Sequence, residues 1–259
     1  MTKAVAILGC GPAGLMVAHA ANQSGWALTI YSRRIKSQLF GAQYLHKPIP
    51  HLDTHGPQMV QYKLIGTPQE YRRKVYGVNW NGTVSPEDFM EQHYAWDLRR
   101  AYDWLWKQYE AWIVDADIPE YPVPYERFDL VISTVPRKIW ANEGDIFEST
   151  KIWALGDGDY KRVHLHRPDD FHVVCDGSNL NPWYRVSNIF GHCTMEWPFY
   201  ESDHRPARGA SMVEKPLRHN SRSAPDFIHL GRYGAWEKGI LTSDVFYQAM
   251  KVFADDKIK

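Results

Sequence analysis

The feature that most constrains this chain is a Gly-x-Gly-x-x-Gly loop, Gly9 to Gly14, directly after the apolar run Val5 to Leu8. The apolar run predicts a buried parallel strand, and residues 15–24 predict an amphipathic helix. In this order, the first glycine allows a tight turn and the second lets the backbone approach a pyrophosphate. The third lets the helix pack closely on the strand, with its N-terminus facing the anion. We therefore expect a dinucleotide-binding loop formed by Gly9, Gly11, Pro12, Ala13 and Gly14.

The apolar start of the chain does not have the pattern of a secretory signal, because Pro12 and the glycines interrupt it early and Asn22 and Gln23 follow. No other stretch approaches the ~20 apolar residues of a membrane-spanning helix. The 30 basic and 30 acidic side chains balance, which gives no indication of nucleic-acid or membrane-surface binding. The three cysteines have neither metal-site nor Cys-x-x-Cys spacing. We expect a reduced, cytoplasmic protein without a redox dithiol.

A second strand, residues 27–31, completes a β-α-β unit that ends at Ser32-Arg33-Arg34. An acidic residue usually binds the ribose at this position. Two arginines here would accommodate the 2′-phosphate of NADP, so NADP stays open as the cofactor. Alternatively, Ser32 binds the ribose while an arginine lies along the adenine or the phosphates.

The next segment, Gly41-Ala42-Gln43-Tyr44, lies in a loop with two nearby prolines. Small residues at this place predict backbone that passes close to a flat or bulky group, hence a cofactor wall. The alternative is an ordinary surface loop.

The remaining segments predict a second domain inserted into the first. Residues 59–65 and 71–78 predict a β-hairpin, and Ser85-Pro86 predicts the start of a helix to about Ile113. Its apolar stripe would consist of Leu98, Tyr102, Leu105, Tyr109 and Trp112. Residues 118–125 predict a linker, and residues 128–136 predict a buried parallel strand. Residues 151–200 predict an antiparallel sheet, with strands near 163–165, 171–175 and 184–190. After a predicted loop over 205–225, residues 227–234 predict a strand that ends in glycines, and residues 245–254 predict a helix capped by 242–244.

The predicted fold class is α/β. A Rossmann-type nucleotide-binding domain, a parallel sheet with helices, would be formed by residues 1–55, 126–160 and 226–259. The inserted substrate domain, with an antiparallel sheet and a long helix, would be formed by residues 56–125 and 161–225.

Three separated motifs together resemble FAD-dependent proteins of the glutathione-reductase-like superfamily. They are the glycine loop, the strand Asp129-x-Val131-Ile132-x-Thr134-x-Pro136, and Leu230-Gly231-Arg232-Tyr233-Gly234-Ala235-Trp236 followed by Asp244. The last motif is most similar to UDP-galactopyranose mutases, and the whole chain resembles small FAD-dependent oxidoreductases of bacteriophage type. The resemblance implies an FAD site in which Gly9, Gly11 and Gly14 hold the pyrophosphate and Gly231 and Arg232 reach the flavin-side phosphates. It adds Gly41, Ala42, Gln43, Tyr44, Thr134, Val135, Pro136, Trp236 and Asp244 to the cofactor-binding residues, beside Ser32, Arg33 and Arg34.

In this superfamily the antiparallel sheet forms one wall of the active site, so the candidate catalytic residues are Tyr184, Arg185 and Glu196. Tyr184 offers a hydroxyl, Arg185 a fork for carboxylate or phosphate, and Glu196 a base or an amine-binding carboxylate. The alternative is that they are ordinary residues of a sheet, whose side chains alternate between its two faces. His46, next to the Gly41 loop, is a candidate acid–base group near the flavin. His164-x-His166 and the pair His51 and His55 lack the further ligands of a metal set, so no metal is expected.

These residues predict an FAD-dependent oxidoreductase that transfers hydride from a small polar substrate, for which an amine is the leading candidate, to the flavin. The alternatives are a non-redox flavoenzyme of the mutase type and a flavin- or NADP-binding protein without turnover.

Overall fold

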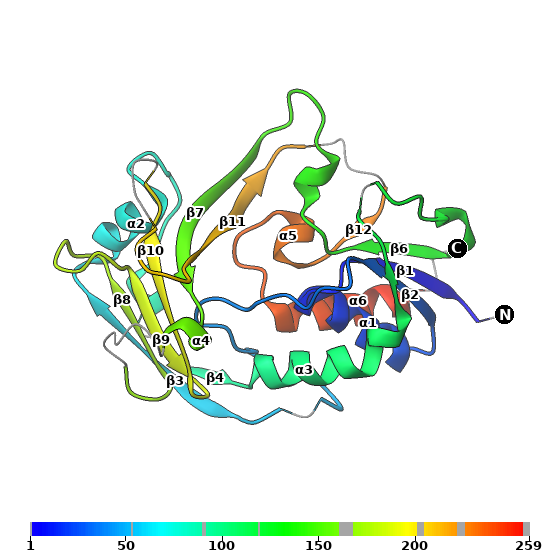
Figure 1. Ribbon diagram of the computed structural model, residues 1–259, viewed down its shortest axis with the longest axis horizontal. Helices are drawn as coiled ribbons and strands as arrows, with labels where there is room; N and C mark the ends of the chain where they lie inside the picture. The colour runs from blue at the N-terminus through cyan, green and yellow to red at the C-terminus, as the bar shows by residue number, and fades with distance from the viewer. Residues whose placement is uncertain are drawn as a thin grey trace.

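The chain forms two sheets. The computed structural model describes residues 2–52, 54–89, 92–118, 120–160, 168–200, 205–221 and 226–255. The first sheet is entirely parallel, and its spatial order is β12 (Ile228–His229), β6 (Leu130–Ser133), β1 (Ala4–Leu8), β2 (Ala27–Ser32) and β5 (Ile113–Asp115). The predicted α/β class, with a Rossmann-like domain beside a second sheet, is confirmed (Figure 1).

The second sheet is mixed. Its order is β11 (Ser211–His219), β7 (Phe147–Leu155), β10 (His192–Pro198), β9 (Arg185–Ile189), β8 (His172–Asp176), β3 (Gln58–Ile65) and β4 (His93–Ala95). All neighbours are antiparallel except β3 and β8, which are parallel. The helices are α1 (Pro12–Gln23), α2 (Pro68–Tyr76), α3 (Leu98–Tyr109), α4 (Asp157–Tyr160), α5 (Gly231–Ala235) and α6 (Thr242–Ala254), with short 3₁₀ turns η1 (Pro86–Phe89), η2 (Glu110–Trp112), η3 (Tyr125–Arg127) and η4 (Arg137–Trp140).

The parallel sheet is buried on both faces, as its continuous apolar strands require. On one face Val5 and Ile7 of β1 belong to the core shared with α1, α3 and α6, which lie together below the sheet in Figure 1. On the other face Ala6 and Leu8 pack in a smaller core with Tyr31. The sheet therefore holds the loop after β1 rigidly at its carboxyl edge.

Two predictions for residues 71–113, a hairpin strand and a single long helix, are wrong. Residues 71–76 are the end of helix α2 rather than the second strand of a hairpin, because Thr67 and Glu70 form a capping box and Pro68 occupies the first helical turn. The single helix expected to reach Ile113 is instead η1, β4 and then α3, which begins at a second cap, Asp97. Its apolar stripe is buried up to Tyr109, whereas Trp112 is 52% exposed.

The contribution of the α2 N-cap to the stability of the protein can be tested by mutation. The Thr67 hydroxyl accepts from the Glu70 backbone N–H, and the Glu70 carboxylate accepts from the Thr67 N–H at 2.7 Å. We expect Thr67→Ala to lower the free energy of unfolding by ~1 kcal/mol, since a lost N-cap leaves a helix N–H unpaired. Chemical denaturation of the two proteins measures this difference, and equal midpoints would contradict it.

Sheet membership also differs from the expected segments. Strand β5, which comes from the range 56–125, belongs to the parallel sheet, and β7, from 126–160, belongs to the mixed sheet. The changes of sheet therefore do not coincide with the expected boundaries at 125 and 160. The loop expected over 205–225 contains the nine-residue strand β11, whose Pro216 is tolerated because β11 lies at the sheet edge beside a bulge. The strand expected at 163–165 lies outside the described residues.

Within the described ranges, no helix is both long and apolar enough to cross a lipid bilayer.

Candidate functional site

Three segments distant in sequence meet at the carboxyl edge of the parallel sheet. At Gly14 an added Cβ would lie 1.9 Å from the Gly9 carbonyl oxygen, so α1 packs on the loop only with glycine there. At Gly231, where φ is +80°, an added Cβ would lie 2.9 Å from the Cβ of Ala13. The middle segment closes the group, since the Thr134 hydroxyl donates to the Leu8 carbonyl at 2.9 Å. The three sequence motifs thus form one site.

The geometry of this site fits a pyrophosphate. Gly11 is the N-cap of α1, no side chain caps the helix, and Pro12 is its first residue. The space beside Gly11 is open, because an added Cβ would meet only the Ser37 hydroxyl, at 3.6 Å. The N-terminus of this twelve-residue helix has no side-chain cap and lies next to open backbone. Such an arrangement is suited to binding a phosphate anion.

Ser32, Arg33 and Arg34, at the end of β2, have different surroundings. Arg33 is 3.6 Å from Asp117, both exposed, and the Arg34 guanidinium donates to the Glu110 carbonyl at 2.6 Å. Ser32 is half-buried and hydrogen-bonds the thiol of Cys10, inside the glycine loop. The arginines expected for an NADP phosphate are therefore engaged by protein groups at the surface, whereas Ser32 borders the loop.

The remaining residues of the middle and closing motifs have structural contacts. Val135 lies against Gly9, since its Cγ1 would be 3.1 Å from a Cβ there, and Pro136 begins η4. Trp236 is 1% exposed and donates to the Glu148 carbonyl at 3.0 Å, so it lies in the protein core and offers no surface to a cofactor. Asp244, in the first turn of α6, accepts from Lys47 at 2.9 Å.

The loop after β2 connects the glycine site to the mixed sheet. Gly41 is buried, with φ at +80°, and an added Cβ would lie 3.0 Å from the Glu196 carboxylate and 3.1 Å from the Arg185 guanidinium. Ala42 packs against the core of the mixed sheet. The Gln43 carbonyl accepts from Arg99 of α3 at 3.5 Å. The loop therefore runs directly over two of the candidate catalytic residues.

The other side chains of this loop are packed inward. The hydroxyls of Tyr44 and Tyr62 are 3.1 Å apart, and Tyr44 is buried. His46 stacks on Tyr44 with ring centroids 4.4 Å apart. Burial, together with the charge of His93, lowers the pKa of His46 to about 4. His46 is therefore a neutral imidazole at physiological pH and a weak base.

The most strongly charged part of the interior is the charge cluster, defined here as Arg185, Glu196 and Lys215. Glu196 is 1% exposed and accepts from the Arg185 Nε and from the Lys215 Nζ. Lys215 also donates to the Tyr184 hydroxyl at 3.1 Å. Strand pairing places all three residues on one face, since Arg185 pairs with Glu196, and Glu196 and Lys215 pair with β7 residues four apart.

The cluster perturbs the ionisation of its members. Burial by itself would raise the pKa of Glu196, but the charges of Arg185 and Lys215 outweigh it and hold the pKa at about 2. Burial, helped by the charge of Arg185 and opposed by that of Glu196, lowers the pKa of Lys215 to about 8. Burial raises the pKa of Tyr184 well above its ordinary value. The cluster thus holds a permanent carboxylate and an amine close to its titration point, and the neighbouring Tyr184 is a protonated phenol.

Sequence reasoning missed Lys215, because the punctuated run 205–225 was interpreted as a loop. The alternation of β11, in which Val213 and Lys215 share the inner face, was the available signal. The charge of Arg232 helps to lower the pKa of Lys215, which indicates that Arg232 lies near the cluster. The Arg232 guanidinium donates to the Pro216 carbonyl at 3.2 Å, and within the described part of the chain its buried Nε has no hydrogen-bond partner.

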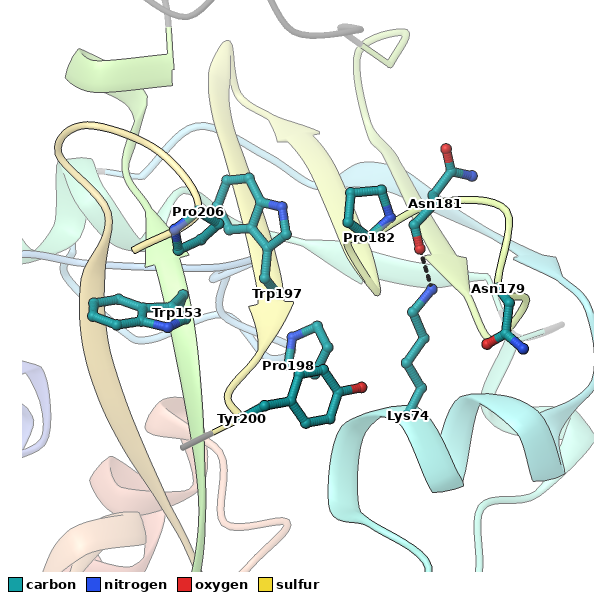
Figure 2. Close-up of a pocket in the computed structure, with 9 residues that line it drawn as sticks. All are labelled: Lys74, Trp153, Asn179, Asn181, Pro182, Trp197, Pro198, Tyr200 and Pro206. Atoms are coloured by element: carbon teal, nitrogen blue, oxygen red, sulfur yellow. Dashed lines mark hydrogen bonds between the residues drawn. The ribbon is translucent and has the colours of Figure 1, made fainter. Parts of the chain in front are cut away.

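A separate cavity of 390 Å³ lies at the end of the mixed sheet (Figure 2). Trp153 and Trp197 form one side, and on the other the Lys74 ammonium donates to the Asn181 carbonyl at 2.8 Å. The two tryptophans pair across β7 and β10 and alternate with Ala154 and Glu196, so they lie on the opposite face from the charge cluster. None of the residues that line this cavity belongs to the cluster.

Within the described ranges, no three His, Cys, Asp or Glu side chains are grouped so as to hold a metal ion. His164 and His166 fall outside those ranges.

Comparisons with known proteins support the fold. No protein-family model matches the sequence, and the curated proteins give no sequence match. Among solved structures, the chain resembles MibH, a tryptophan 5-halogenase, with a TM-score of 0.57, 12% identity, and coverage of 98% of this chain and 66% of the halogenase. It also resembles a flavoprotein/dehydrogenase from Cytophaga hutchinsonii (TM-score 0.53, 13% identity, 98% and 77% coverage). CtdE, in complex with FAD and a substrate, is similar as well (0.53, 12%, 98% and 80%).

The chain spans just under two-thirds of the halogenase, and at these identities the likeness concerns the fold. The fold is that of a Rossmann-like domain joined to a curled mixed sheet, an arrangement that the chain shares with these distantly similar structures.

Proposed function

We propose that this protein is an FAD-dependent oxidoreductase that acts on a small molecule held at the charge cluster. The observation that supports it best is the meeting of the Gly9–Gly14 loop, Thr134 and Gly231 at the edge of the parallel sheet. The fold likeness to CtdE, whose structure contains FAD, supports the same cofactor. Bound FAD would supply a two-electron acceptor.

In this proposal Gly11 and the N-terminus of α1 hold the pyrophosphate, Ser32 binds a ribose hydroxyl, and Gly41 lets the loop approach the flavin. The resemblance to the mutases and to bacteriophage-type oxidoreductases assigns Gly231 and Arg232 to the flavin side. We keep Gly231 there, but we assign Arg232 to the substrate, because its charge interacts with Lys215 of the charge cluster. Tyr184 and Lys215 are the groups that would donate or accept a proton at the substrate. Glu196 is a positioning residue, since its carboxylate fixes both cations.

An amine substrate, expected from Glu196, receives no support from this geometry. The Glu196 carboxylate is buried and already neutralised by Arg185 and Lys215. A substrate ammonium would have to displace one of these buried partners, and breaking a buried ion pair is costly.

Gly11→Ala tests the cofactor assignment. The added methyl group has room in the protein, with its nearest contact at 3.6 Å, and Gly11 has an ordinary φ of −65°. We expect unchanged stability of the apoprotein but FAD affinity lowered by ~10-fold or more, because the methyl group occupies the phosphate approach. Titration of apoprotein with FAD, followed by flavin fluorescence, measures the affinity.

Gly191→Ala is the control. Gly191 lies at a turn with φ at +74°, so the substitution costs backbone strain, but nothing lies within 4 Å of an added Cβ. It should leave FAD affinity unchanged. A wild-type protein that is colourless as purified, binds no added FAD and is stabilised by NADPH would overturn the proposal.

A further inference from the structure

We infer that the substrate of this site is an anion, a small organic molecule with a carboxylate, held by Arg185, Lys215 and Arg232. The inference concerns the substrate class and rests on the proposed function only in calling the bound molecule a substrate. Anion binding itself follows from the charges of the cluster and its surroundings.

The first argument is an excess of positive charge. Arg185, Lys215 and Arg232 interact electrostatically with one another, and the single acidic partner within the group is Glu196. The other titratable side chains that interact with these residues include one further cation, Lys238. The rest have raised pKa values and carry no charge at neutral pH: Tyr44, Tyr62, Tyr71, Tyr76, Cys175, Tyr184 and Tyr233. Partly desolvated cations are costly unless an anion pairs with them, so the site favours an anionic ligand.

The second argument is the geometry of the donors. Arg185 uses its Nε to bond Glu196, and its two Nη atoms are further donors on the same guanidinium. They lie beside Gly41, where an added Cβ would be 3.1 Å from one of them. The buried Nε of Arg232 has no hydrogen-bond partner among the residues that the structure describes. A guanidinium with parallel N–H groups is suited to a carboxylate.

The third argument is access. The Glu196 side chain is only 2% exposed, whereas those of Arg185 and Lys215 are 23% and 18% exposed. The cations therefore retain contact with solvent while their internal partner does not. Tyrosines cover the same face, since Tyr71 packs edge-on against Tyr184 with centroids 5.8 Å apart. Flat rings beside cations favour an organic anion over an inorganic one.

The test compares benzoate with benzamide, its uncharged counterpart of the same shape, by isothermal titration calorimetry on the protein as purified. We expect benzoate to bind at least ~10-fold more tightly than benzamide and inorganic phosphate at pH 7. Lys215→Met should remove most of this preference without changing the affinity for benzamide. Lys151→Met, on the opposite face of the same sheet, should change neither affinity.

A pH series on the wild-type protein tests the same inference if Lys215→Met does not fold. Because an anion is held by the protonated amine, benzoate affinity should fall as the pH rises through about 8, the pKa of Lys215 set by burial among Arg185, Glu196 and Arg232. Benzamide affinity should stay constant over this range.

Equal affinities for benzoate and benzamide, or a preference for phosphate, would overturn the anionic-substrate inference while leaving an FAD-containing protein consistent with the proposed function. A preference for benzoate in a protein that binds no FAD would support the anion site and overturn the proposed function. Absence of binding by all three probes overturns the inference.

Discussion

Glu196→Gln is expected to lower the free energy of unfolding by about 3–5 kcal/mol at pH 7, because it removes a buried carboxylate and leaves two largely buried cations without their counter-ion. The effect should depend on pH with a definite sign. The folded-state pKa of Glu196, about 2, lies below its ordinary value of 4.5. The contribution of ionised Glu196 to the free energy of unfolding is therefore fully present above pH 4.5 and is lost as the pH falls toward 2. Urea denaturation at pH 7 and pH 3 should show a smaller difference between wild type and variant at the lower pH.

Glu214→Gln is the matched control on the neighbouring part of the sheet. Glu214 pairs with Lys138, but the two side chains are 27% and 42% exposed. A partly exposed pair of this kind contributes less than about 1 kcal/mol. If Glu196→Gln cost no more than Glu214→Gln, the charge cluster would not be the buried, coupled group described here.

Gly14→Ala should be the most damaging substitution in the nucleotide-binding loop. The added Cβ would lie 1.9 Å from the Gly9 carbonyl oxygen and 3.0 Å from the Thr134 hydroxyl, and backbone cannot retreat as a flexible side chain can. We expect a loss of about 3 kcal/mol or more in unfolding free energy, together with loss of bound FAD. Thermal and urea unfolding of the apoprotein measure the first effect separately from the second.

Gly25→Ala is informative beside it, because Gly25 has φ at +72° and nothing within 4 Å of an added Cβ. It should cost only the backbone strain, ~1 kcal/mol. Equal losses for Gly14→Ala and Gly25→Ala would show that α1 can move away from the loop.

The parallel sheet was predictable because its signals are local. Val5 to Leu8, the glycine spacing and residues 27–31 each specify their own element, and the order of elements specifies the β-α-β unit. The errors occurred where two local signals compete. In residues 67–76 the capping box outweighs the β-rich composition, and at Asp97 a second helix cap divides a pattern that reads as continuous.

The candidate site was predictable only in part, for a different reason. Arg185 and Glu196 pair across the adjacent strands β9 and β10, so a prediction of these strands brings them together, and Tyr184 directly precedes β9. Lys215 joins them from β11, two strands from Glu196, and no local pattern specifies a strand order in which β7 lies between β10 and β11. For Trp236 the sequence is misleading in the opposite direction. Its neighbours fit a cofactor motif, but its own side chain is buried in the core.

The contact between Gly231 and Ala13 has a consequence for the order of events during synthesis. One wall of the proposed pyrophosphate site comes from Ala13, and the facing wall comes from Gly231, which the ribosome adds only after all strands of the mixed sheet have been made. A nascent chain that ends before α5 can form β1 and α1 but lacks the residues that close around the phosphates. If the proposed cofactor is FAD, it would therefore bind only after α5 has been made.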